Sequence, residues 1–161
     1  MSSRPVMLGA MRSVFRWLTS ILFVAVVIQV GLAGYGIFNA IHKAKTAPLT
    51  QKALEDDLGA HGVFGYLVLL IMLLMLIVAL AGRVGSSEAK WAGGIFLLGL
   101  LQAILGAASI SAPALGFLHG VNALAIYAAA ALLAHGTWTQ HRAAAGGADA
   151  QGVAPARSPS G

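Results

Sequence analysis

The sequence predicts an all-α fold, namely an integral membrane, up-down four-helix bundle built from two repeated helical hairpins. Hydrophobic residues make up 58% of the 161 residues and charged residues only 9%, whereas about 25% of a soluble domain is charged. Four apolar segments reach the roughly 20 residues that cross a bilayer as a helix. Because lipid offers the backbone no hydrogen-bond partners, each of these segments is expected to be helical.

The helices are expected at about residues 14–41, 60–82, 91–110 and 113–135. The first has a basic start, but its apolar stretch exceeds the roughly 7–15 residues of a signal-peptide core, so we interpret it as a retained helix. Short loops follow the second and third helices. Short loops make successive helices antiparallel neighbours, which predicts the up-down bundle.

Lysines and arginines predict the orientation, because cytoplasmic loops carry an excess of them. Seven of these residues lie on the side of both termini, and three lie on the other side. Both termini are therefore expected in the cytoplasm, with the multi-pass domain of residues 14–142 in the membrane. Residues 1–13 are expected to form a basic N-terminus. Residues 143–161 are rich in Ala, Gly, Pro and Ser, which predicts a disordered tail.

One long connection, at about residues 42–60, separates the first two helices and carries three lysines followed by three acidic residues. A short surface helix is expected over residues 50–58. Asp57 is expected to cap the second membrane helix, since acidic residues suit the positive helix start. Asp57 also lies four residues before His61, so a divalent-metal site at the outer surface is a weaker alternative interpretation.

A histidine inside a membrane is costly and indicates a functional site. His61 and His119 each begin an apolar stretch with the same three residues, His-Gly-Val. Each follows a helix that carries one glutamine, Gln29 or Gln102, and the residues after these glutamines are also similar. The matches favour a duplicated hairpin whose two copies point the same way across the membrane. The alternative is chance similarity between stretches rich in Ala, Gly, Leu and Val.

Both histidines start helices that run inward, so they are expected at similar depth near the outer face. Diagonal helices of a bundle lie about 11–14 Å apart when neighbours pack at about 8–10 Å. This gap suits two imidazoles that ligate one iron, an arrangement typical of a low-spin b-type haem in electron transfer. Gly65 and Ala123, four residues after the histidines, would leave room for a flat macrocycle. Propionates directed outward would find Lys43, Lys45, Lys52 and His42 at the rim.

Other roles stay open for the same residues. In one alternative the histidines are structural and form hydrogen bonds between helices. The small residues then serve close helix packing. Gln29 and Gln102 would orient the ligating histidines, touch a porphyrin substituent, or simply join helices. Asn122, three residues after His119, is expected to act in the same way on the fourth helix.

The run from Gln102 to Gly106, followed by His119 and by Ala123 four residues later, resembles the second hairpin of one half of a haem A synthase. The resemblance implies a four-helix half in which histidines of the second and fourth helices ligate a haem. His61 and His119 occupy the matching places. The sequence departs from that family around His61, where Gly62 follows in place of the expected arginine.

The chain as a whole, over about residues 18–135, resembles a family of small uncharacterised bacterial four-helix membrane proteins. The shared features are the Gln-x-x-Leu-Ala-Gly sequence that starts at Gln29, the His61-to-Gly65 start of the second helix, a glutamine in the third helix and the Leu118-His119 pair. This resemblance implies the fold and a location in the bacterial plasma (inner) membrane, and it carries no known activity.

We therefore expect a membrane-embedded haem b protein that exchanges electrons with a quinone or a membrane redox partner. The alternative is a non-catalytic accessory or assembly subunit of a larger respiratory complex, or a homodimer, with structural histidines. The absence of cysteine excludes thiolate haem ligands, covalent haem attachment and iron–sulfur clusters. The basic residues flank apolar segments, so no nucleic-acid binding is expected. A transporter is disfavoured because no acidic residue lies within a predicted helix.

Overall fold

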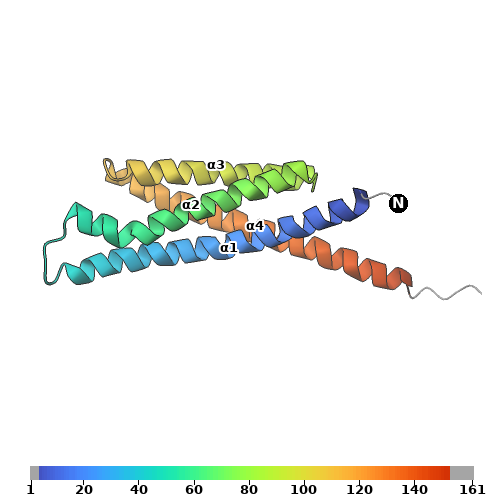
Figure 1. Cartoon of the computed structure of the whole chain (residues 1–161), viewed down its shortest axis with the longest axis horizontal. Helices are drawn as coiled ribbons and strands as arrows, with labels where there is room; N and C mark the ends of the chain where they lie inside the picture. The colour runs from blue at the N-terminus through green and yellow to red at the C-terminus, as the bar shows by residue number, and fades with distance from the viewer. Residues whose placement is uncertain (1–3, 153–161) are drawn as a thin grey trace, which may run out of the picture.

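A computed structural model describes residues 4–152 of the chain as four helices joined by short connections (Figure 1). Their bounds are Arg4–Lys43 for α1, Gln51–Ala81 for α2, Ser86–Ala108 for α3 and Pro113–Gly152 for α4. Each helix contains a stretch long and apolar enough to cross a membrane. The predicted all-helical membrane bundle is therefore confirmed, and the chain is a multi-pass membrane protein.

The helices alternate in direction around the bundle (Figure 1). Helix α1 packs against α2 and α4, and α3 packs against the same two helices, whereas the diagonal pairs α1–α3 and α2–α4 make no backbone contact within the described residues. The loops after α1 and after α3 lie together at one end, which we call the loop end. The start of α1, the end of α4 and the α2–α3 turn lie at the other end, which we call the terminal end (Figure 1).

The first and last helices of the chain, α1 and α4, are longer than the sequence predicts. Helix α1 and helix α4 each contain 40 residues. At 1.5 Å per residue such a helix is about 60 Å long, roughly twice the thickness of a bilayer core. Helix α4 continues through residues 143–152, which we expected to be disordered, and the alanines in this stretch favour helix. The rest of the expected tail, and residues 1–3, lie outside the described residues.

The start of α2 also differs from the expectation. A surface helix followed by a cap at Asp57 was expected, but α2 begins at Gln51 and runs unbroken into the membrane span. Thr50 is the N-cap, and its hydroxyl accepts a hydrogen bond from the backbone N–H of Ala53 at 3.1 Å. Pairs four residues apart, such as Lys52 with Asp56, support this polar first part of the helix.

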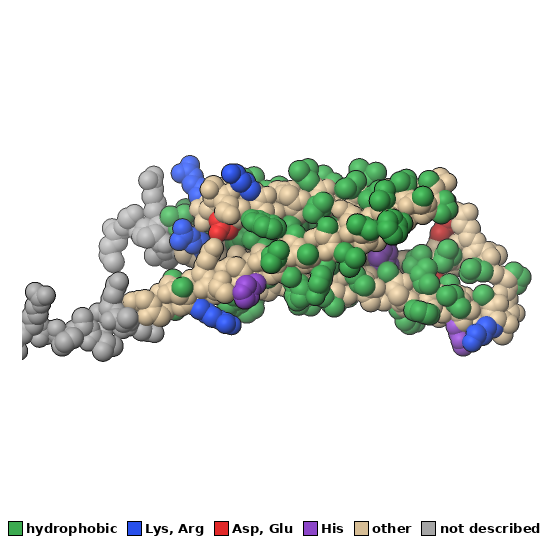
Figure 2. Space-filling view, turned by 180° about the vertical axis from the view of Figure 1, so that it is seen from behind, with side chains coloured by type: hydrophobic (Ala, Val, Ile, Leu, Met, Phe, Trp, Pro, Cys, Tyr) green, Lys and Arg blue, Asp and Glu red, His purple; other side chains and the backbone are tan. Residues whose placement is uncertain are grey.

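The core of the bundle consists of apolar side chains from all four helices. The largest fully buried side chains are Phe15, Leu22, Met72, Met75, Ile95 and Thr19. Hydrophobic side chains also cover much of the outer face that Figure 2 shows, between the charged ends. An outer surface of this kind is what a bilayer solvates, so the exposed apolar residues are consistent with contact to lipid.

Helices α1 and α2 pack closely together near the loop end. A Cβ atom at Gly36 would lie 2.6 Å from the backbone oxygen of Asp57. Close by, the side-chain amide of Asn39 donates to Asp57 Oδ1 at 2.8 Å, and Lys43 forms an ion pair with the same carboxylate. The two helices can therefore pack closely because residue 36 has no side chain. Asp57 links α2 to α1 through Asn39 and Lys43.

Candidate functional site between the two hairpins

The first hairpin holds His61 through Gln29. The ring Nδ1 of His61 lies 3.1 Å from the backbone oxygen of Gln29, on the neighbouring helix α1. The side-chain amide of Gln29 donates to the backbone oxygen of His61 at 2.8 Å, and its nitrogen lies 3.5 Å from His61 Nε2. Two side chains thus join α1 to α2 at half-buried positions inside the membrane span.

The second hairpin repeats this arrangement with His119 and Gln102. Nδ1 of His119 lies 3.1 Å from the backbone oxygen of Gln102, and Nε2 lies 3.0 Å from the side-chain nitrogen of Gln102. The two glutamine–histidine matches in the sequence therefore correspond to two matching contacts in space. The structure brings together each glutamine and histidine that the sequence singled out as a pair.

These partners define the protonation of both rings. A backbone oxygen only accepts hydrogen bonds, so Nδ1 of each histidine carries the proton and donates it. Nε2 is then the nitrogen with the free lone pair, and it faces the N–H group of a glutamine amide. Both rings thus share one arrangement, in which Nδ1–H donates to a backbone oxygen and the Nε2 lone pair is available. This is the form in which a histidine ligates a metal through Nε2.

The two histidines approach each other across the diagonal of the bundle. Their ring centres lie 6.2 Å apart, and the ring planes make an angle of 68°. Because α2 and α4 make no backbone contact, the two rings extend toward each other from opposite sides of the bundle. Figure 2 shows a histidine side chain recessed between the helices, among hydrophobic groups. The histidine pair is thus one of the places where polar side chains of the two hairpins meet, and Thr19 with Thr137 is another.

An asparagine makes the two hairpins unequal. Asn122 is buried, and its amide donates to Oε1 of Gln102 at 2.7 Å and to the backbone oxygen of Leu98 at 2.9 Å. Phe64 takes the equivalent position, three residues after His61, in the first hairpin. There, Oε1 of Gln29 is buried and has no hydrogen-bond partner among the described residues. Both the nitrogen and the oxygen of the Gln102 side-chain amide thus have partners, whereas only the nitrogen of the Gln29 amide has one among the described residues.

The role of Asn122 can be tested by the variant Asn122→Leu. It removes two hydrogen bonds between α4 and α3, and such bonds in membrane proteins contribute about 0.6 kcal/mol each on average. Adding the cost of leaving Gln102 Oε1 unpaired, we expect a loss of about 1–3 kcal/mol in the free energy of unfolding. Unfolding by SDS in mixed micelles measures it. Gln140→Leu changes an exposed amide on the same helix and should stay within about 0.5 kcal/mol; equal losses would contradict the proposed role.

Small residues beside the site make room for the polar side chains. A Cβ atom at Gly65 would lie 3.1 Å from the amide nitrogen of Gln29, and one at Gly106 would lie 3.1 Å from Cε1 of His119. Gly65 was expected to leave room for a macrocycle, but in this structure its space is taken by Gln29. The equivalent residue Ala123 is half-buried. The importance of Gly106 for the histidine ring was not recognised from the sequence, because small residues are common throughout these helices.

The lysines expected at the rim are mostly engaged with carboxylates. Lys43 pairs with Asp57, and Lys52 pairs with Asp56. Asp57 therefore points toward α1, where Asn39 also binds it, instead of forming a metal site with His61. Within residues 7–147, no group of three or more His, Asp or Glu side chains is arranged to hold a metal ion. A site for a bare divalent ion is thus not supported among these residues.

A family model matches residues 29–109, and it is described as a family of unknown function (DUF6220). The match begins at Gln29, includes His61 and Gln102, and ends before His119. No curated protein and no solved structure matches the chain at a significant level. The match is consistent with the expected uncharacterised family, whereas the resemblance to haem A synthase stays a prediction.

Proposed function

Because the chain belongs to the DUF6220 family of unknown function, its activity must be inferred from its own residues, and we propose that it is a b-type haem protein of the bacterial plasma membrane. In this proposal His61 and His119 ligate the haem iron from opposite sides. Gln29 and Gln102 orient the two rings. The haem site lies in the half of the membrane nearer the loop end.

The separation of the two imidazoles carries the proposal. Two imidazole nitrogens that each bind one metal at about 2.0–2.1 Å place the ring centres about 6 Å apart. The observed distance between the ring centres of His61 and His119 is 6.2 Å. The angle of 68° between the rings does not conflict with ligation, because each ring can rotate about its bond to the metal. The chain thus holds two imidazoles at a distance that suits one shared metal.

The bonds of Nδ1 support the same interpretation. Histidines that ligate metals almost always donate their second N–H to a carboxylate, a backbone oxygen or water, which fixes the ring orientation. Both rings donate to the backbone oxygen of a glutamine, at 3.1 Å in each hairpin. This leaves Nε2 as the ligating atom of each ring.

Ligation requires the glutamine amides to turn away from Nε2. At His61 the distance between Nε2 and the Gln29 nitrogen is 3.5 Å, at the limit of a hydrogen bond, but turning this amide also breaks its 2.8 Å bond to the backbone oxygen of His61. At His119 the corresponding distance is 3.0 Å, and Asn122 holds the glutamine in place. In this proposal each histidine therefore exchanges a contact with its glutamine for the metal.

When bound, haem supplies one-electron redox chemistry. The residues of the chain hold the two imidazoles in place, with Nδ1 of each ring bonded to a backbone oxygen of the neighbouring helix. A single site near one face does not carry an electron across the bilayer, so a quinone or a membrane redox partner is part of the proposal. Lys45, whose side chain is exposed at the loop end, is free of the ion pairs that engage Lys43 and Lys52 and is available to a propionate.

The optical spectrum of the purified full-length protein tests the proposal. The protein is expressed in cells supplied with a haem precursor, and haem is also titrated into the purified protein. We expect one haem per chain, with the Soret band and the sharp reduced α band of a low-spin, six-coordinate b-type centre. A folded protein without a Soret band under both conditions would overturn the proposal.

A second candidate, a non-catalytic subunit of a larger membrane complex, is favoured by one observation. Both nitrogens of each histidine ring already have partners within the same hairpin, as structural histidines in a membrane would. The variant Gln102→Leu separates the two functions. If the histidines are ligands, the variant keeps haem with an altered spectrum. If they are structural, wild type has no haem, and the variant loses stability as His119→Ala does.

A further inference from the structure

We propose that a groove between α1 and α4 at the terminal end binds an anionic phospholipid. The groove has a volume of about 440 Å³, and its lining residues are Phe23, Ala131, Ala134, His135, Trp138 and Arg142. Its lining is apolar at Phe23, Ala131 and Ala134, and it becomes polar further along α4, toward Arg142. A groove that changes in this way along a membrane helix matches an acyl chain that ends in a headgroup.

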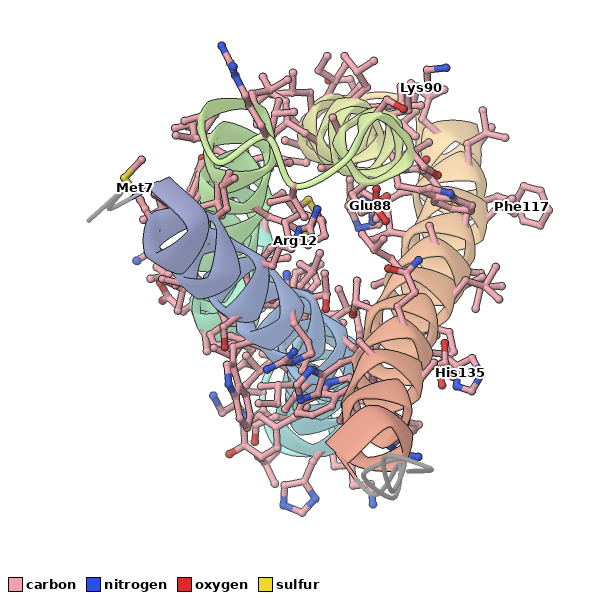
Figure 3. The ribbon with its side chains drawn as sticks, turned by 90° about the vertical axis from the view of Figure 1, so that its right-hand side faces the viewer. Met7, Arg12, Glu88, Lys90, Phe117 and His135 are labelled. Atoms are coloured by element: carbon pink, nitrogen blue, oxygen red, sulfur yellow. The ribbon has the colours of Figure 1, made fainter. Side chains whose placement is uncertain are left out.

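The apolar part has the shape that an acyl chain needs. The alanines of α4 leave space beside Phe23, whose ring lies 5.4 Å from that of Tyr127. The opening faces outward, toward the lipid: Figure 3 shows the side chain of His135 pointing away from the centre of the bundle, whereas Arg12 and Glu88 point into it. The groove is thus open to lipid and separate from the histidine pair of the candidate site.

The polar part concentrates cations around one tryptophan. The Arg16 guanidinium lies 4.8 Å from the centre of the Trp138 ring, and Arg142 lines the groove beside the same ring. Trp138 donates to the hydroxyl of Ser20 at 2.8 Å, and Trp17 packs edge-on against it. Tryptophan is enriched at the headgroup level of membranes, so this cluster is expected to lie where phosphates lie.

The arginines of this cluster have no carboxylate partner in the described part of the chain. Both ion pairs found there involve lysines of the loop end. Nε of Arg16 is buried without a hydrogen-bond acceptor among the described residues. Among residues 7–147, the terminal end carries five basic residues and one acidic residue, Glu88, and Figure 2 shows Lys and Arg side chains gathered there. A phosphate group would complement this charge, and basic pockets between membrane helices bind anionic headgroups.

Native mass spectrometry of the full-length protein in detergent tests the lipid site. Phosphatidylglycerol and phosphatidylcholine with identical acyl chains are added in competition, so that only the headgroup charge differs. We expect wild type to retain phosphatidylglycerol preferentially. Arg142→Gln should lower this preference about fivefold, which is the contribution expected from one basic residue near a membrane surface.

Two further variants keep the test decisive. Arg83→Gln removes the same charge at the same end, in the α2–α3 turn away from the groove, and should leave the preference unchanged. Ala134→Phe fills the groove without changing any charge and should lower retention of phosphatidylglycerol. Equal retention of the two lipids by wild type, an equal effect of Arg83→Gln and Arg142→Gln, or unchanged retention by folded Ala134→Phe would each overturn the proposal.

Discussion

The variants His61→Ala and His119→Ala are each expected to lose at least about 100-fold in haem affinity, because changing only a residue that supports a metal ligand already costs 10–100-fold. Each substitution removes one of the two nitrogens that the proposal assigns to the iron. Haem titration into the purified variants measures the affinity. Any haem that remains should show the high-spin spectrum of a five-coordinate centre, since one axial position is then open.

Two other histidines of the chain serve as matched controls. His141 is exposed on α4 toward the terminal end, and His135 points away from the bundle centre (Figure 3). Alanine at either position should leave the haem affinity and the spectrum as in wild type. Wild-type spectra for both His61→Ala and His119→Ala would show that other groups bind the haem. Equal losses in all four variants would point to a general defect in folding instead of ligation.

The membrane fold could be predicted from composition and segment length alone, because a bilayer imposes helices on every apolar span. The residues at which the helices begin and end could not be predicted in this way. Residues 50–58 were expected to form a separate surface helix within the connection, yet Thr50 caps the membrane helix itself and pairs such as Lys52–Asp56 stabilise its first turns. Outside the bilayer core the choice between helix and loop depends on capping and local pairs, whose signals in the sequence are weaker than hydrophobicity.

The pairing of glutamine with histidine could be inferred from the repeat, because scarce polar residues at matching places in a membrane are expected to meet. The distance between the histidine rings could not be inferred. It depends on how far each side chain extends from α2 or α4 into the space between these two helices, which make no backbone contact. The asymmetry introduced by Asn122 also required coordinates. Its amide reaches both Gln102 and Leu98 on α3, a choice of partners that the sequence does not reveal.

The variant Gly36→Ala is expected to lower the free energy of unfolding by about 1–3 kcal/mol, the usual cost of adding atoms to a well-packed contact. The new Cβ would lie 2.6 Å from the backbone oxygen of Asp57 and 2.9 Å from Cδ2 of Leu58. The leucine side chain can rotate, but the backbone oxygen belongs to α2. Helices α1 and α2 must therefore separate, which also weakens the bonds of Asn39 to Asp57.

Gly34→Ala is the matched control, because a Cβ at Gly34 would meet nothing within 4 Å in the same helix two residues earlier. Alanine favours a helix over glycine by up to about 1 kcal/mol, so this variant should be as stable as wild type or slightly more stable. Unfolding by SDS compares the two proteins. If Gly36→Ala matched Gly34→Ala, the close approach of α1 and α2 would not limit stability. If it alone is destabilised and also binds haem less tightly, the α1–α2 contact helps to position His61 opposite His119.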